Sequence, residues 1–370
     1  MNFSHESLPS VKAYFPPDEA IIGNTFYDLQ TNASMQNRIF VYDDGTIGAV
    51  WTLGFNFPNF ADDRGTGYNY FDGNDWGPYP TERIEDDRCG WPAYSAFGEN
   101  GEINIAHLAG GTEDGLKILI RDEKGVGNWV QSTFYGPTGN EGMVWPRITT
   151  AGVNHSVIQL MALTRPTANG GSIYEGLDGA VLYSRSSDGG DTWDIENVIL
   201  DGLTSNEYTG FSGDTYEIQA QGDNVAMLIG ESWIDLILMK STDGGDTWEK
   251  TVVWENPYPM FGGAATDTFY CPDGAHSLAF DQSGKVHIVF GINRAHSDGA
   301  GQFWFPFIGG IGYWNEDRPV FSNDLNALCP FSDCTYSELV DDYSLIGWTQ
   351  DVDGDGEITL LDDVAPYYLG

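Results

Sequence analysis

The side chains best spaced for chemistry are the acidic residues near the end of the chain. Between residues 351 and 362, oxygen-bearing side chains alternate with other residues, Gly356 supplies a sharp bend and Ile358 a hydrophobic anchor. The acidic positions are Asp351, Asp353, Asp355, Glu357 and Asp362. Oxygens at this spacing wrap a hard cation such as Ca²⁺. We therefore predict a structural calcium loop here, and the alternative is a solvated acidic turn.

A second group with binding chemistry is the aromatic set in the Gly- and Asn-rich segment 65–76. Tyr68, Tyr70 and Trp76 lie there among small polar residues. Exposed aromatic rings present large apolar faces on which sugars stack, so we expect a ligand-binding insertion loop. The alternative is a loop whose rings pack on one another.

Cysteine and histidine spacing does not indicate a zinc site. The four cysteines lack paired C-x-x-C spacing, and the six histidines lack an H-E-x-x-H pair. Cys329 and Cys334 are close enough in sequence to close a short disulfide loop, and the alternative is that all four cysteines are packed thiols.

Charge excludes two classes of partner. With 16 basic and 55 acidic residues the chain carries a formal charge of −39. So few Lys and Arg argue against nucleic acid and against anionic membrane surfaces. No apolar run is long enough for a transmembrane helix, and the polar start lacks a signal core. The excess of acidic over basic residues suits a saline extracellular medium. We therefore expect a secreted or cell-surface protein whose signal segment has been removed.

The elements that position these residues are short strands. Runs rich in Val, Ile, Tyr and Trp alternate with turns, and five of them form hairpins around glycines 45, 101, 152, 222 and 284. The intervals of 56, 51, 70 and 62 residues fit the blades of a β-propeller with loop insertions. A sandwich is the runner-up, but it would not repeat one hairpin five times.

A second repeat of the form S-x-D-x-G-x-T-W occurs twice, each time after an apolar strand. We predict a tight turn in which the Asp carboxylate accepts backbone N–H groups, Gly adopts positive φ and Trp packs beneath. The matching positions are Ser186, Asp188, Gly190, Thr192 and Trp193, and Ser241, Asp243, Gly245, Thr247 and Trp248.

These two turns resemble the Asp-boxes of sialidase-like (BNR-repeat) β-propellers, and Arg38-Ile-Phe resembles the opening strand of that family. The resemblance covers about residues 20 to 320, and the chain is also similar to large secreted bacterial propeller proteins. It implies an all-β propeller of about six four-stranded blades, with the last blade incomplete unless the N-terminal strand completes it. The family's Asp-boxes are structural and lie away from the catalytic face.

The predicted organisation is one domain. Residues 1–20 form an N-terminal extension and residues 21–370 a single propeller, with the calcium-type loop inserted near 351–362. The alternative for that loop is the start of a dockerin or linker region.

The resemblance also implies where catalytic groups would stand. Family enzymes use three arginines, a Tyr–Glu pair and an Asp acid/base. Arg38 matches the first arginine, Asp62 (or its neighbour Asp63) the acid/base and Glu217 the glutamate, whereas the next arginine and the Tyr find no match. For both we favour the alternative, in which Arg38 forms hydrogen bonds in the central channel or between blades and Glu217 is a polar contact between blades. Arg147 is a substitute ligand-facing arginine.

We therefore expect a secreted, non-catalytic propeller that binds a carbohydrate or another ligand or assembles at the cell surface. Its partners would be glycans or extracellular proteins, with self-assembly, including into a filament, as a further option. The alternative is a sialidase-like glycoside hydrolase that uses Arg38, Asp62 and Glu217 in the channel.

Overall fold

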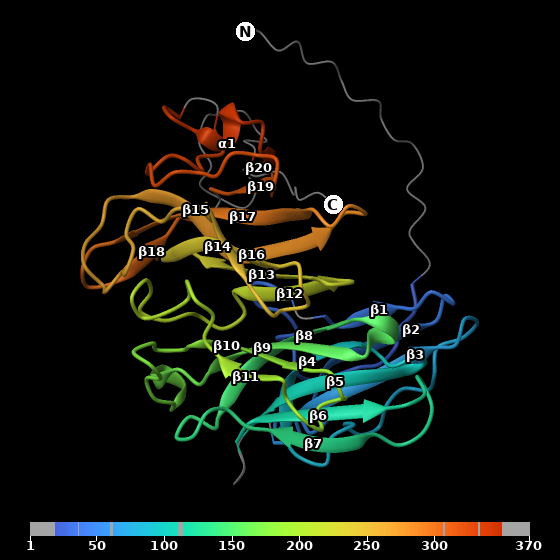
Figure 1. The fold of residues 1–370 in the computed structure, drawn as a ribbon. Helices are drawn as coiled ribbons and strands as arrows, with labels where there is room; N and C mark the ends of the chain where they lie inside the picture. Colours follow the sequence, from blue (N-terminus) through green and yellow to red (C-terminus); the bar gives the residue numbers. More distant parts are fainter. Residues whose placement is uncertain are drawn as a thin grey trace.

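The computed structural model describes residues 19–35, 37–59, 62–109, 114–305, 308–331 and 334–349. In these residues the chain forms twenty β-strands and very little helix, and the strands build five antiparallel sheets. The sheets succeed one another along the chain as propeller blades (Figure 1). The predicted all-β propeller is therefore confirmed, and five blades lie within the described residues.

Each blade is a meander whose strands are numbered in chain order. Blade 1 comprises β1 (Ile39–Val41), β2 (Ile47–Leu53) and β3 (Gly65–Phe71). Blade 2 comprises β4 (Cys89–Phe97), β5 (Gly101–Leu108), β6 (Leu116–Arg121) and β7 (Val130–Phe134). Blade 3 comprises β8 (Met143–Ala151), β9 (Val157–Thr164), β10 (Val181–Ser186) and β11 (Ile195–Val198). Blade 4 comprises β12 (Tyr216–Gln221), β13 (Asn224–Glu231), β14 (Ile234–Ser241) and β15 (Glu249–Trp254). Blade 5 comprises β16 (Phe269–Phe280), β17 (Val286–Ser297), β18 (Gln302–Trp304), β19 (Gly310–Asn315) and β20 (Leu345–Trp348). The described helix α1 spans Glu338–Asp341, and two short 3-10 turns span Val153–His155 and Thr167–Asn169.

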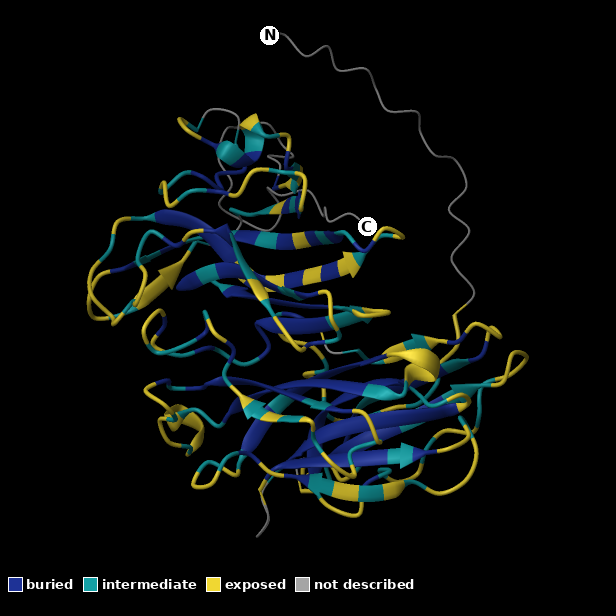
Figure 2. Ribbon diagram, viewed as in Figure 1, coloured by how far each residue is buried: buried dark blue, intermediate teal, exposed yellow. Residues whose placement is uncertain are grey.

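The blades pack face to face, and this packing explains the burial pattern. Every residue of β5 is buried, whereas the outer strand β11 alternates between half-buried and exposed (Figure 2). A strand covered on both faces needs apolar or paired side chains at every position, so it loses the alternation of a one-sided sheet. The inner strands therefore read as continuous apolar runs.

The two sides of the propeller can be told apart by strand register. The first strands of blades 2 to 5 pack against one another in chain order around the axis. We call the side where these strands begin the start face and the side where they end the turn face. Antiparallel pairing sets Thr164 opposite Met143 on the start face, and Ser186 opposite Ile158 on the turn face.

Both S-x-D-x-G-x-T-W turns lie on the turn face and share one geometry. Ser241 Oγ donates to Asp243 Oδ1 (2.7 Å) and accepts from the Gly245 N–H (2.8 Å). The same carboxylate accepts from the N–H (2.9 Å) and the hydroxyl (2.6 Å) of Thr247. The turn that begins at Ser186 repeats these contacts to within 0.2 Å. Trp248 packs edge-on against Tyr183 of the preceding blade.

A third turn occupies the same place in blade 2 without the motif. In this turn, between β6 and β7, the Gly125 N–H donates to Glu102 of β5 (3.1 Å). Glu102 also forms a buried ion pair with Arg121. The Arg121 guanidinium in turn lies 4.3 Å from the Trp129 ring centroid. Arg121 ends β6 where the other two turns begin with Ser, and the accepting carboxylate comes from Glu102 of β5, which is why the sequence pattern missed this turn.

The turn carboxylates predict an acid-dependent contribution to stability. Hydrogen bonds from the Thr247 side chain and backbone and from Ser241 lower the pKa of Asp243 to about 2, from 3.8. Because the folded-state pKa lies below the unfolded value, this contribution is present above about pH 4 and is lost as pH falls through 2. We expect Asp243→Asn to lower the melting temperature at pH 7, and the difference from the wild type to shrink between pH 4 and pH 2. Thermal unfolding across this range measures it, with the exposed Asp191→Asn as control. A variant as stable as the wild type at pH 7 would contradict the expectation.

An N-terminal segment plugs the axis. Ser34 is 2% exposed, and its hydroxyl lies 2.9 Å from Nδ1 of His276 in β16. Its N–H donates to the Asp214 carbonyl (2.6 Å), and its own carbonyl accepts from Arg147 of β8 (3.0 Å). Because Asp214 leads into β12, this one residue links three blades.

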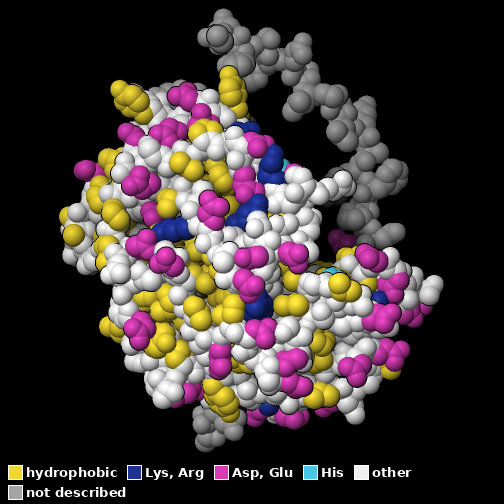
Figure 3. Space-filling view, in the orientation of Figure 1, with side chains coloured by type: hydrophobic (Ala, Val, Ile, Leu, Met, Phe, Trp, Pro, Cys, Tyr) yellow, Lys and Arg dark blue, Asp and Glu magenta, His cyan; other side chains and the backbone are white. Residues whose placement is uncertain are grey.

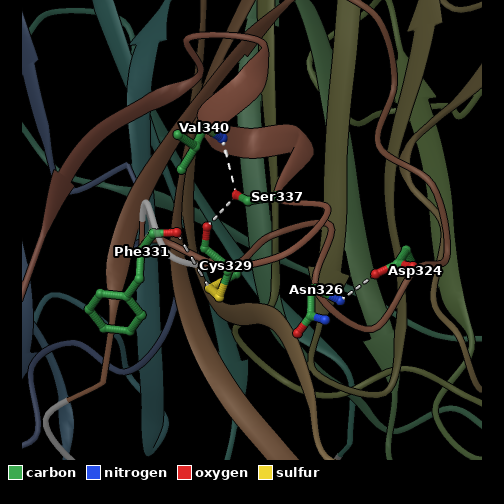
Figure 4. Close-up of a disulfide and its surroundings, with 7 residues drawn as sticks. Asp324, Asn326, Cys329, Phe331, Ser337 and Val340 are labelled. Carbon is green, nitrogen blue, oxygen red and sulfur yellow. Dashed lines mark hydrogen bonds between the residues drawn. A yellow bond between two sulfur atoms is a disulfide. The ribbon is translucent and has the colours of Figure 1, made fainter. Parts of the chain in front are cut away.

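The last described segment is held by a disulfide. Cys329 and Cys334 are bonded, with their Cα atoms 6.4 Å apart (Figure 4). Ser337 donates to the Cys329 carbonyl (2.6 Å) and caps α1 by accepting from Val340 N–H (3.2 Å). The predicted disulfide is therefore present and the alternative of four packed thiols is wrong, although Cys89 and Cys271 are buried free thiols.

Segment 65–76 was predicted as an insertion loop, and that prediction is wrong. Residues 65–71 are strand β3, which follows β2 in a regular ladder, because the alternating Thr, Tyr and Tyr side chains suit a pleated strand. The predicted calcium loop at 351–362, and nearly all of the predicted extension 1–20, lie outside the described residues.

Candidate functional site

A cavity of about 610 Å³ opens on the start face between blades 1, 2 and 3. Three arginines line it: Arg64 precedes β3, Arg88 precedes β4 and Arg165 follows β9. The cavity walls also carry aromatic rings, Tyr27, Trp91 and Trp145, and the imidazole of His107. We call this cavity the arginine pocket. It lies on the opposite side of the molecule from the two S-x-D-x-G-x-T-W turns.

Backbone carbonyls hold two of the three guanidinium groups. Arg64 Nε donates to the Cys89 carbonyl (3.0 Å), and Arg88 Nη1 donates to the Ala109 carbonyl. Arg165 instead pairs with Asp114 (2.5 Å), whose side chain is 51% exposed. Asp114 is the only carboxylate among the described residues that line the pocket. Asp114 is thus the carboxylate that the described lining places beside the three guanidinium groups, and the charge of Asp62, outside the lining, also acts on Arg88.

Mutual repulsion in the pocket is visible at Arg88. Burial lowers the pKa of Arg88, and the neighbouring Arg64 lowers it further. Repulsion between like charges makes such a cluster unfavourable. It also gathers three of only ten arginines in a chain whose charge is −39. Figure 3 shows the contrast: acidic side chains are scattered over the face in view, where Lys and Arg are few.

His107 is a neutral hydrogen-bond donor to the pocket. Its Nδ1 accepts the backbone N–H of Trp145 (3.2 Å), so the ring proton resides on Nε2, 3.5 Å from Arg64 Nη2. Burial, and then the charges of Arg64, Arg165 and Arg88, lower the pKa of His107 to about 3. The guanidinium and imidazole groups at this point offer N–H donors, and the Tyr27 hydroxyl lies 3.5 Å from Arg64 Nη1.

Strained backbone places the two tryptophans. Trp91 and Trp145 have φ of 57° and 50°, each precedes a proline, and each lies at a break in register of its inner strand. Such bulges redirect side chains and occur near functional sites. Here they bring both indoles against His107, with centroids 6.4 Å away. The Trp-Pro dipeptide, which occurs at both positions, was the sequence signal for these two bulges.

The lowered pKa of His107 gives a direct prediction. We expect its imidazole in the free protein to stay neutral from pH 8 to pH 5, because its pKa of about 3 lies far below 6.5. NMR of the imidazole signals, assigned with His107→Gln, follows this titration. The surface-accessible His287, which is 32% exposed, provides the comparison within the same spectra. A His107 midpoint between pH 6 and pH 7 would refute the pocket electrostatics described above.

The residues expected to line a central channel lie in the plugged interior. Arg147 is 2% exposed and pairs with Asp214 (2.8 Å), which also accepts from Trp91 Nε1 (2.7 Å). Glu217 is 6% exposed, lies 3.6 Å from His276, and burial raises its pKa.

The two remaining catalytic candidates, Arg38 and Asp62, lie in different surroundings. Arg38 donates to Gln30 (3.1 Å), and burial together with the charge of Arg147 lowers its pKa to about 10. Asp62 lies on an exposed turn before β3, where its charge acts on Arg88. Asp62 thus adjoins the arginine pocket, whereas Arg38, Arg147 and Glu217 do not line it.

Two of the three aromatic candidates contact blade 2, and the third packs within blade 1. Tyr68 donates to Glu102 (2.9 Å) and packs edge-on against Trp129. Tyr70 is half-buried beneath Gly125, and Trp76 packs against Phe71. The described residues hold no group of three His, Cys, Asp or Glu side chains placed for a metal, and the predicted calcium ligands lie beyond them. No helix in the described part of the chain is long and apolar enough to cross a bilayer.

Comparison with known proteins bears on the fold. No protein-family model matches the chain, and neither does any curated protein sequence. A sialidase from Trypanosoma rangeli in complex with the inhibitor DANA matches with a TM-score of 0.38 and 12% identity, over 80% of this chain and 54% of that chain. An ulvan lyase, a polysaccharide lyase, matches with a TM-score of 0.43 and 11% identity, over 80% and 82%. The catalytic domain of an α-L-arabinofuranosidase from Coprinopsis cinerea matches with 0.40 and 11%, over 73% and 87%.

These neighbours are sialidase-like and other carbohydrate-active enzymes. This chain spans about half the length of the sialidase. At such identities the likeness concerns the fold alone, so the function has to be argued from the arginine pocket.

Proposed function

We propose that this protein binds an acidic saccharide in the arginine pocket, through a carboxylate or sulfate group. The observation that carries the proposal is the convergence of Arg64, Arg88 and Arg165 on one cavity beside a single described carboxylate. An anion in the cavity accepts charge-assisted hydrogen bonds from these groups in the planar geometry that guanidinium groups favour.

The remaining walls suit a sugar ring. Trp145 and Tyr27 line the cavity next to the guanidinium groups and offer apolar ring faces to the C–H groups of a saccharide. His107 adds a neutral donor that reaches a hydroxyl or an anionic oxygen equally well. A pocket with cationic donors on one side and aromatic rings on the other matches a ligand with one charged group and an apolar ring edge.

Binding without turnover is the form that the geometry favours. Most glycoside hydrolases use two carboxyl groups that flank the scissile bond, and sialidases use a Tyr nucleophile instead of one of them. The described residues of the pocket supply one carboxylate, Asp114. The alternative hydrolase assignment relies on Glu217, which is almost fully buried beside His276. A fluorogenic sialoside assay tests it, because turnover that Glu217→Gln abolishes would establish the hydrolase.

The proposal includes an extracellular setting. The Cys329–Cys334 disulfide suits an oxidising compartment. A structural calcium ion near residues 351–362, glycan or protein partners at the cell surface, and self-assembly belong to the same proposal.

A saccharide panel tests the proposed function. Acidic sugars (glucuronic acid and glucose 6-sulfate) and neutral glucose are titrated into the protein by calorimetry at about 20 and 150 mM salt. We expect the acidic sugars to bind and glucose not to bind, with affinity falling as salt rises. Equal binding of glucose and glucuronic acid would defeat the proposal.

A further inference from the structure

A second cavity of about 440 Å³ adjoins the arginine pocket. Asp63 lines the second cavity and the next residue, Arg64, lines the first. Arg83 braces this shared wall by donating to the Asp63 carbonyl (3.4 Å). The two cavities therefore open side by side at the end of β2 and the beginning of β3, on the start face.

The second cavity carries the opposite charge. Asp63, Glu82 and Glu85 line it, and its one basic residue, Arg83, donates to backbone carbonyls of residues 63, 85 and 86. The Asp63 carboxylate accepts from Asn56 Nδ2 (2.8 Å), and Glu82 is exposed. Carboxylate and amide groups suit sugar hydroxyls, whereas this excess of negative charge repels a second anion.

Two exposed rings lie on the same loops. Phe57 is 71% exposed and Phe26 is 54% exposed, with centroids 5.5 Å apart. Phe26 immediately precedes Tyr27 of the arginine pocket, and Phe57 follows Asn56 of the second cavity. Aromatic rings left in solvent beside polar hydroxyl-binding groups provide a stacking surface for a sugar ring.

We propose that the two cavities are neighbouring subsites for one saccharide chain in which acidic and uncharged units alternate. The acidic unit occupies the arginine pocket, and the next, uncharged unit stacks on Phe57 and bonds to the exposed Glu82 of the second cavity. This inference rests on the proposed function. It adds that the ligand is an oligosaccharide, and that a polymer with a charge on every unit is disfavoured.

The test compares three probes by calorimetry at low salt. These are glucuronic acid, tetrasaccharides of hyaluronan and chondroitin, in which acid and uncharged units alternate, and tetragalacturonate, in which each unit is acidic. We expect one of the alternating tetrasaccharides to bind about tenfold or more tightly than glucuronic acid, and tetragalacturonate to gain little. Phe57→Ala should weaken the alternating ligand about fivefold and leave glucuronic acid unchanged. Glu82→Gln should strengthen tetragalacturonate selectively.

The controls separate the two proposals. Tyr343→Ala removes another exposed ring, 87% exposed, beyond blade 5, and should change nothing. If glucuronic acid binds but neither alternating tetrasaccharide binds more tightly than it, or if Phe57→Ala has no effect, the second subsite is refuted and the proposed function stands. If no acidic sugar binds, the proposed function itself fails.

Discussion

Arg64→Gln is expected to weaken the binding of an acidic saccharide about thirtyfold or more. Arg64 stands at the centre of the pocket, with its terminal nitrogens 3.5 Å from both the Tyr27 hydroxyl and His107 Nε2. A hydrogen bond to a charged group contributes about 2 kcal/mol, and each 1.4 kcal/mol is about tenfold in affinity. Glutamine keeps a polar amide in the pocket, so the loss measures charge and forked geometry. Calorimetry at low salt gives the affinity.

Two further variants make this result specific. Arg64→Lys keeps the charge but loses the planar fork, so an intermediate affinity is expected. Arg185→Gln removes an arginine of the turn face, which pairs with Asp246 (2.7 Å), and should leave binding unchanged. If Arg64→Gln and Arg185→Gln weaken binding to the same extent, the ligand responds to overall charge and the pocket is not its site.

Asp214→Asn is expected to lower the free energy of unfolding by about 3 kcal/mol. Asp214 and Arg147 are 3% and 2% exposed, and the carboxylate also accepts from the indole of Trp91. Breaking a buried ion pair leaves a charge without compensation in the interior, which costs about 3–5 kcal/mol. Asparagine is the suitable replacement because Asp214 has φ of 63°, a conformation that Asn tolerates. Urea unfolding measures the loss.

The matched control is an ion pair on the surface. Asp246→Asn breaks the contact with Arg185, but Asp246 is 63% exposed, so a loss of at most about 1 kcal/mol is expected. Equal losses in the two variants would mean that the axial network contributes no more than a surface pair.

The hairpin glycines show why the fold could be predicted. Four of the five turn glycines, Gly45, Gly152, Gly222 and Gly284, have φ between 61° and 83° and join the first two strands of their blades. A residue type that tolerates positive φ marks these turns in the sequence itself. In the fifth hairpin Gly98 has the positive φ, and Gly101 begins β5. Turn chemistry is local, so the repeat was readable without a structure.

The arginine pocket was not predictable in the same way. Arg64, Arg88 and Arg165 lie on loops of different blades, and only the antiparallel register brings them to one side. None of them falls at a position where the sialidase-like pattern places an arginine. Of the residues chosen from that pattern, Glu217 is buried and Arg38 is half-buried, because Ser34 fills the axis that the pattern assumes to be open.

The plug at Ser34 also bears on how the protein is made. The two groups that meet there, the Ser34 hydroxyl and His276, are 242 residues apart in the chain. At typical rates of synthesis the second emerges roughly 10 to 50 s after the first. Ser34 is thus synthesised well before blade 5, and its contact with His276 can form only after β16 has been made. The arginine pocket, whose lining residues lie between residues 27 and 169, can therefore form before this axial contact.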